Sequence, residues 1–232
     1  MIYKVASSFA EVLDAWSLVY HQYLTAGLIK PNDYSIFTFP EYLSNNAAVI
    51  IGKDNGVTTC TASAVLDSKL GLPLDTQYKK ELDQLRTEGR KLIEIGLVAD
   101  SRNHQNFSDV IELMNSVARF GPYSKHLDFV VGINPRRVNL YGKLWGFKQI
   151  GIIKDYEKLK TAPVALLHLS GNDLEIRSLK MNQEIYSDQR NLDFESRYKF
   201  NPNNYIANHE FNASVDSLIR RVWNRQPVLR VA

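Results

Sequence analysis

The sequence has a single cysteine, Cys60, and no long hydrophobic run. One cysteine excludes an intramolecular disulfide and a metal site made of cysteines alone. No window reaches the roughly 18 apolar residues of a membrane-spanning helix, and the start MIYKVASSFAEVL lacks the apolar run of a signal peptide. We therefore expect a cytoplasmic protein that does not span a membrane.

Charge of one sign is also scarce, because 28 Lys and Arg residues face 25 Asp and Glu residues among 232. This balance gives no indication of binding to nucleic acid or to an anionic membrane. The chain also lacks a P-loop, a dinucleotide-binding glycine motif and a serine-nucleophile elbow. Its five histidines have no metal-ligand spacing. We expect no bound metal or cofactor.

The apolar periodicity predicts alternating helices and strands. Helical spacing covers 9–24, an aromatic-rich loop that lines a pocket or seals the core covers 26–43, and Asn55-Gly56 predicts a hairpin between strands 47–53 and 57–66. The remaining elements are a helix at 76–89, a strand at 90–99, a helix at 107–120, a strand at 127–133, a helix from Pro135, and strands at 147–153 and 162–169. This order indicates an α/β (α+β) fold with a mixed central sheet, antiparallel early and crossing over later.

Composition divides the chain near residue 170. From there the sequence is polar and rich in asparagine, and its one clear amphipathic helix lies in NASVDSLIRRVW, with Asn212 as the N-cap. We expect one domain at 1–169 and a helical extension at 170–232 that packs on it. Within the domain, we expect the thiol of Cys60 to be buried and structural.

The segment RKLIEIGLVAD, residues 90–100, places a carboxylate inside an apolar strand. Because side chains alternate along a strand, Glu94 shares its face with Leu92, Gly96 and Val98, and Leu97 shares the other face with Ile95. Gly96 would leave space for a ligand beside Glu94. Partial desolvation would raise the carboxyl pKa, which suits a general base acting on an amine. The alternative is that Glu94 pairs with an arginine or caps backbone donors inside the sheet.

A second candidate is Tyr141, in the segment NPRRVNLYGKLWGF at 134–147. A tyrosine held near a thioester can protonate the departing thiolate. The alternative role of Tyr141 is packing.

With these two segments in place, the chain resembles acyltransferases of the GNAT superfamily. LYGKLWGF is similar to the helix-to-strand motif that carries a tyrosine general acid in many of those enzymes. The resemblance implies that the strand of Glu94 supplies the general base and splays from strand 127–133. It also implies that the pantetheine arm of the thioester donor pairs with backbone near Leu97 and Val98.

A narrower resemblance covers about residues 5–170. The span TASAVLDSKLGLPLDTQYKKELDQLRTEGRKLIEIGLVAD is similar to long-chain N-acyl amino acid synthases of the N-acyl tyrosine type, which are related to acyl-homoserine lactone synthases. The shared features are a strand ending at Asp67, the Gly-Leu-Pro at 71–73, a helix ending in Gly-Arg and the Glu94 strand. The resemblance places Asp67 and Gly96 among the substrate-binding residues.

Two departures from the superfamily pattern bear on the acyl donor. CoA-dependent members bind the pyrophosphate with a glycine-rich loop before a helix N-terminus, but the corresponding loop here, DSRNHQNF, has no glycine. This favours an acyl carrier protein, whose phosphopantetheine phosphate Arg102 or Arg137 could hold. Arg137 itself stands where relatives often have a histidine.

The sequence therefore predicts an N-acyltransferase that moves a long-chain fatty acyl group from acyl carrier protein to the amine of an amino acid. Glu94 would deprotonate the amine, through a water, and Tyr141 would protonate the thiol. Two alternatives stay open: an acyl-CoA-dependent enzyme with another amine acceptor, and a non-catalytic module that binds an acylated carrier.

Overall fold

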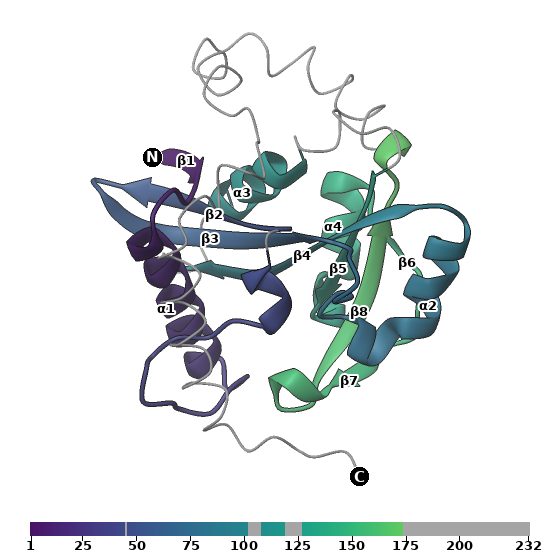
Figure 1. Ribbon diagram of the computed structural model, residues 1–232, viewed down its shortest axis with the longest axis horizontal. Coiled ribbons are helices and arrows are strands. Elements are labelled where there is room, and N and C mark those ends of the chain that lie inside the picture. The colour runs from purple at the N-terminus through teal and green to yellow at the C-terminus, as the bar shows by residue number, and fades with distance from the viewer. Residues whose placement is uncertain (45, 102–107, 119–126, 174–232) are drawn as a thin grey trace, which may run out of the picture.

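The computed structural model describes residues 1–44, 46–101, 108–118 and 127–173. In this part of the chain one sheet lies between two layers of helices (Figure 1). The strands are β1 (Ile2–Val5), β2 (Ala47–Asp54), β3 (Val57–Leu66), β4 (Lys91–Asp100), β5 (Leu127–Ile133), β6 (Lys148–Gln149), β7 (Lys154–Tyr156) and β8 (Ala162–Leu169). The helices are α1 (Phe9–Thr25), α2 (Asp75–Thr87), α3 (Ser108–Ala118) and α4 (Val138–Trp145), with 3-10 turns η1 (Pro40–Leu43), η2 (Pro135–Arg137) and η3 (Glu157–Leu159).

The strand order is β1-β2-β3-β4-β5-β8-β6, with β7 paired to β8. All pairs are antiparallel except β4 with β5, which are joined through the crossover that contains α3. The predicted mixed sheet is therefore confirmed. The hairpin between β2 and β3 is confirmed as well, because Asn55 and Gly56 both adopt positive φ, 48° and 83°.

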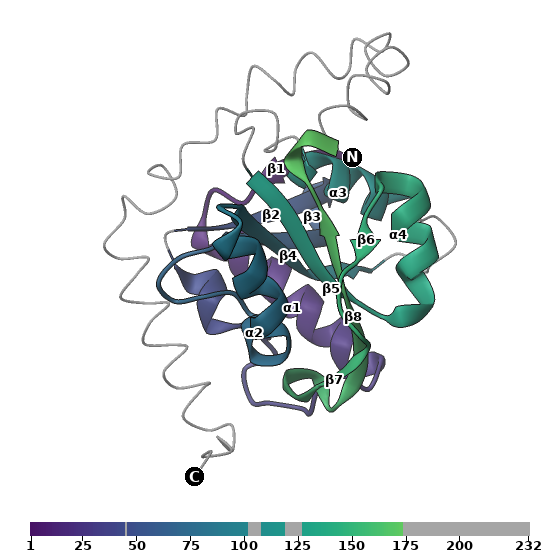
Figure 2. The same cartoon turned by 90° about the vertical axis from the view of Figure 1, so that its right-hand side faces the viewer.

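Helices lie on both faces of the sheet (Figure 2), and an apolar core lies between the sheet and the helices on each face. The α1-face core joins α1 and α2 to side chains such as Leu92. The α3-face core joins α3 and α4 to side chains such as Ile93 and Ile95. Cys60 is fully buried in the α3-face core beside Ala62, as predicted.

Some predictions of the elements need correction. Strand 147–153 is reduced to Lys148–Gln149, and the edge strands β1 and β7 were not predicted. Apart from residues 170–173, the proposed extension, with its helix near Asn212, lies outside the described residues. Within the described ranges, no helix combines the length and the apolar character needed to cross a membrane.

Candidate active site

The two parallel strands in the middle of the sheet, β4 and β5, pair along only part of their length. Pairing of β4 with β5 runs from Lys91–Leu127 to Ile95–Val131 and then stops. β4 nevertheless continues to Asp100, and the end of β5 pairs only with β8 on its other side. Among the described strands, none pairs with β4 beyond Ile95 on the β5 side, which is the splay that the superfamily resemblance implied.

A β-bulge in β4 marks the point of separation. Gly96 pairs with Ser63 and Ala99 with Thr61, so two residues of β4 lie opposite one residue of β3. Leu97 adopts a positive φ of 49° there. A bulge of this kind bends the strand and resets its alternation.

The bulge overturns the predicted facing of two residues. Leu97 lies in the α1-face core with Leu92, and Val98 packs against the α3-face core with Ile95. The simple alternation was wrong here because it ignored the extra residue.

Glu94 lies before the bulge, on the α1 face of the sheet. It is 4% exposed, and its Oε2 accepts a hydrogen bond of 2.9 Å from the backbone N–H of Leu74. Burial raises the pKa of the carboxyl well above its usual range, against the lowering effects of the Leu74 bond and of Lys158, and the nearby Glu41 and Asp75 raise it further. A carboxyl with a raised pKa binds a proton more readily, as a general base for an amine must.

The space beside Gly96 is not empty, contrary to expectation. A Cβ built on Gly96 would lie within 3.0 Å of the Tyr42 hydroxyl and 3.9 Å from Oε1 of Glu94. Tyr42 belongs to η1, in the aromatic-rich loop, and is 3% exposed. Its hydroxyl has no hydrogen-bond partner among the described residues. The aromatic-rich loop was predicted from the sequence, but no sequence pattern connects Tyr42 with Gly96.

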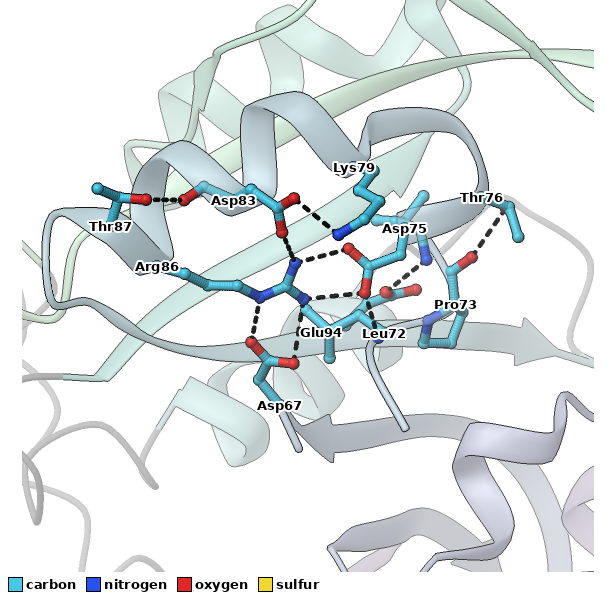
Figure 3. Close-up of polar contacts among 11 residues, drawn as sticks. Asp67, Leu72, Pro73, Asp75, Thr76, Lys79, Asp83, Arg86, Thr87 and Glu94 are labelled. Atoms are coloured by element: carbon cyan, nitrogen blue, oxygen red, sulfur yellow. Dashed lines mark hydrogen bonds and ion pairs between the residues drawn. The ribbon is translucent and has the colours of Figure 1, made fainter. Parts of the chain in front are cut away.

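An arginine on α2 organises the loop that reaches Glu94. Arg86 binds Asp67 through Nε (2.6 Å) and Nη2 (3.0 Å), and it also binds Asp75 and Asp83 (Figure 3). Asp75 Oδ2 in turn accepts from the N–H of Leu72 at 2.7 Å. These bonds fix the turn that carries Leu74. Asp67, predicted to bind substrate, is thus held by a structural ion pair.

The same turn is held from the opposite side by two further groups. The Tyr156 hydroxyl donates to the carbonyl of Pro73 at 3.2 Å, and Lys158 Nζ donates to that carbonyl and to Glu41 Oε1, both at 3.2 Å. The hydrogen-bond donor of Glu94 is therefore fixed in place on two sides.

Tyr141 lies on α4, on the other face of the sheet from Glu94. Its ring packs against Trp145 at 4.9 Å and Phe147 at 6.0 Å between centroids. Burial raises the pKa of its hydroxyl, so the proton stays in place at ordinary pH.

Of the two arginines predicted to bind phosphate, the structure describes only Arg137. Arg137 is exposed at the N-terminus of α4, where its charge lowers the pKa of Tyr141 slightly against the larger effect of burial. Arg102 and most of the loop without glycine lie outside the described residues. In the part of the chain that is described, no cluster of three His, Cys, Asp or Glu side chains could hold a metal ion.

A second buried carboxylate, Asp128 of β5, belongs to a different network. It accepts from Arg90 Nε at 2.7 Å and from the Gly171 N–H at 3.0 Å, and it contacts His168 Nε2 at 2.8 Å. These bonds outweigh its burial and lower the pKa of Asp128. Both carboxylate oxygens of Asp128 have hydrogen-bond partners. In Glu94, by contrast, Oε1 has no hydrogen-bond partner among the described residues.

Comparison with known proteins agrees with this architecture. Residues 14–170 match the family model of the N-acyl amino acid synthase FeeM. The solved structure of FeeM, from uncultured soil microbes, superposes with a TM-score of 0.65 at 24% identity over 75% of this chain and 97% of that one. No curated protein sequence matches.

Two more distant structures share the fold. The CoA-dependent acyl-homoserine lactone synthase BjaI gives a TM-score of 0.53 at 11% identity over 75% of this chain and 85% of that one. An acyl-CoA N-acyltransferase from Pseudomonas aeruginosa gives 0.51 at 11% identity over 73% of this chain and 99% of that one.

Proposed function

Because the chain belongs to the FeeM N-acyl amino acid synthase family, an N-acyltransferase family, we propose that it transfers a long-chain acyl group from a thioester to the amine of an amino acid. The observation that carries this proposal is the buried Glu94 immediately before the point where β4 and β5 separate. At this point the candidate base, Glu94, lies next to the gap between β4 and β5.

The thioester would enter through the gap between β4 and β5. Beyond Ile95, backbone groups of β4 have no partner on β5, so Gly96, Leu97 and Val98 could bind the amide groups of a pantetheine arm. The reacting carbonyl would then lie close to Gly96, within reach of an amine on the α1 face.

The chemistry divides between the two faces of the sheet. Glu94, on the α1 face, takes a proton from the amine nitrogen, which attacks the thioester carbon and forms the C–N bond. The C–S bond breaks, and Tyr141, on the α3 face, gives its proton to the sulfur. The proton taken up by Glu94 passes through solvent to Tyr141, which returns both groups to their starting states.

We propose acyl carrier protein as the donor, on the sequence of the loop at 100–107, with Arg102 and Arg137 as ligands of the phosphopantetheine phosphate. Asp67 would support substrate binding indirectly, through Arg86 and the turn that reaches Glu94. The extension at 170–232 would pack on the domain formed by 1–169.

The test is to incubate the purified full chain with a set of acylated carrier proteins and a mixture of amino acids, and to identify N-acyl products by mass spectrometry. We expect a product whose mass gives both the acyl chain and the acceptor. A product formed from acyl-CoA but not from acylated carrier protein would identify acyl-CoA as the donor. If carrier protein binds but neither donor gives a product, the protein is a binding module and the proposal fails.

The Glu94→Gln variant tests whether acyl transfer depends on the candidate site. It keeps the size of the side chain and its acceptor for Leu74 but removes the base, so turnover should fall by about 100-fold or more. Glu88→Gln, at the exposed C-cap of α2, is the matched control and should keep wild-type turnover. Wild-type turnover in Glu94→Gln would remove Glu94 from the mechanism.

A further inference from the structure

The hydroxyl of Tyr42 is a buried polar group that the mechanism above does not use. The residue is 3% exposed, and its hydroxyl finds no hydrogen-bond partner among the residues that the structure describes. A buried hydroxyl without a partner is costly to the free protein, so such groups often have a partner that binds during function.

The surroundings of this hydroxyl indicate where that partner binds. The hydroxyl lies over Gly96, close to the position that a Cβ would occupy, and Oε1 of Glu94 is 3.9 Å from the same position. Oε2 of Glu94 is already bound by Leu74, so Oε1 is the oxygen left to take a proton. Tyr42 and Oε1 therefore approach one point on β4, beside the gap.

The ring of Tyr42 is held in a fixed position. It stacks on Phe39 with 6.3 Å between centroids and an interplanar angle of 28°, and Phe39 itself carries Lys158 5.0 Å from its ring centre. Burial and the nearby Glu94 raise the pKa of the hydroxyl well above its usual range. Tyr42 is thus a fixed hydrogen-bond donor.

We propose that Tyr42 is a positioning residue of the deprotonation step: its hydroxyl and Oε1 of Glu94 together bind the water molecule that carries the proton from the attacking amine. Tyr42 donates to the water oxygen, and the water donates to Oε1. An N–H bond of the amine breaks as an O–H bond forms on the water, which passes its other proton to Oε1. The water is regenerated, the amine loses one proton and Glu94 gains it. This inference rests on the proposed function.

The replacement Tyr42→Phe removes only the hydroxyl and keeps the stacked ring. We expect kcat/KM to fall by about 10- to 100-fold while thermal stability is unchanged or higher, because the hydroxyl makes no hydrogen bond to another described residue. The acidic limb of the pH profile should move up by roughly half a unit to one unit, because the charged form of Glu94 loses a hydrogen-bonded neighbour. The other titratable groups that act on Glu94 are unchanged in this variant: Glu41, Asp75, Tyr156 and Lys158.

Tyr20→Phe is the matched control. Tyr20 is buried to a similar extent, but its hydroxyl accepts from the N–H of Asn32 at 3.3 Å and donates to the carbonyl of Asn32 at 3.4 Å. We expect the reverse pattern in this variant, a lower melting temperature with wild-type kcat/KM. Wild-type kcat/KM in Tyr42→Phe would overturn the proposal, and so would a loss of activity with lowered stability and an unmoved acidic limb.

A second measurement separates this inference from the proposed function. If the wild-type chain shows no acyl transfer, the titration of a carbon-13-labelled Glu94 carboxyl can still be followed by NMR in the full chain. A higher pKa of Glu94 in Tyr42→Phe than in wild type would support the shared water. An unchanged pKa would overturn it, whatever the reaction.

Discussion

Glu94 Oε2 accepts a hydrogen bond of 2.9 Å from the backbone N–H of Leu74, so the candidate base is joined to the turn that precedes α2. This single bond does not compensate the burial of the carboxylate, since burial is the largest influence on its pKa and raises it. The ionised site is therefore a local source of instability, and the predictions for stability and activity have opposite signs.

Glu94→Gln should be more stable than wild type at pH 7.5, by about 1–3 kcal/mol in urea unfolding. The pKa of Glu94 is raised in the folded state, so its contribution to stability is fully present below the ordinary value of 4.5 and is lost as pH rises through the folded value. The advantage of the variant should therefore shrink toward pH 4. A variant less stable than wild type at pH 7.5 would mean that the carboxylate has ionic partners that offset its burial.

Gly96→Ala tests the close approach of Tyr42. The added Cβ would lie within 3.0 Å of the hydroxyl, which should cost about 1–3 kcal/mol of stability. In a Tyr42→Phe background the nearest atom becomes Cζ of the ring, at 3.3 Å, so most of that cost should disappear. A double-mutant cycle by denaturant unfolding measures this coupling. Equal costs in both backgrounds would place the hydroxyl elsewhere.

Arg86→Met should lower both stability and activity. It leaves Asp67 and Asp75 without the cation that joins them, while Asp83 keeps its pair with Lys79, and we expect this to cost about 2–4 kcal/mol. It should also lower kcat by roughly 10-fold, because the turn carrying Leu74 is no longer fixed relative to Glu94. Unfolding and steady-state kinetics measure the two effects.

The control for Arg86 is another cation of the same helix. Lys79→Ala removes a surface pair with Asp83, and the Lys79 side chain is 70% exposed, so we expect less than about 0.5 kcal/mol. Arg86→Lys should rescue little, because an ammonium group does not reproduce the bidentate contact with Asp67. Full rescue by lysine would show that charge alone is enough.

Tyr141→Phe distinguishes a general acid from a packing residue. Its hydroxyl has no hydrogen-bond partner among the described residues, so its removal should leave the melting temperature within about 2 °C of wild type. A general acid should nevertheless contribute to kcat, and we expect a fall of about 10-fold or more. Because burial raises its pKa above 10.0, Tyr141 should give no basic limb below that pH in wild type. Unchanged kcat would leave Tyr141 with packing alone.

Most of the fold could be predicted from local sequence patterns. The helical spacing of 9–24 and the Asn55-Gly56 turn are properties of neighbouring residues, and both were predicted from sequence. The bulge at Leu97 depends on how β4 pairs with β3 and leaves β5, so the alternation predicted beyond Gly96 failed. Side-chain period alone does not reveal an extra residue in a strand.

The candidate site could likewise be predicted only in part from the sequence. A carboxylate inside an apolar strand is visible in the sequence, so Glu94 could be selected. Its neighbour Tyr42 comes from a loop far away in the chain, and no periodicity connects the two. Arg86 was hidden for a related reason: its spacing to Asp83 is that of a helical pair, but its bonds to Asp67 require the folded turn.

Asp128→Asn provides the contrast with Glu94, because the two buried carboxyls lie on adjacent strands but should depend on pH in opposite ways. The pKa of Asp128 is lowered in the folded state by His168 and Arg90, so its stabilising effect is present above the ordinary value of 3.8 and is lost as pH falls through the folded value. The variant should therefore lose about 3–5 kcal/mol at neutral pH, and less below pH 4.

This loss should leave the chemistry intact, since Asp128 bonds only to structural partners within the described chain. At a temperature where Asp128→Asn remains folded, its kcat should match wild type, whereas Glu94→Gln should be more stable than wild type and slower by about 100-fold or more. Measuring unfolding and kcat for both variants at pH 4.5 and 7.5 assigns one carboxylate to stability and the other to catalysis. A similar loss of kcat in both variants would contradict that assignment, because it would mean that the strand pair responds to either change as a unit.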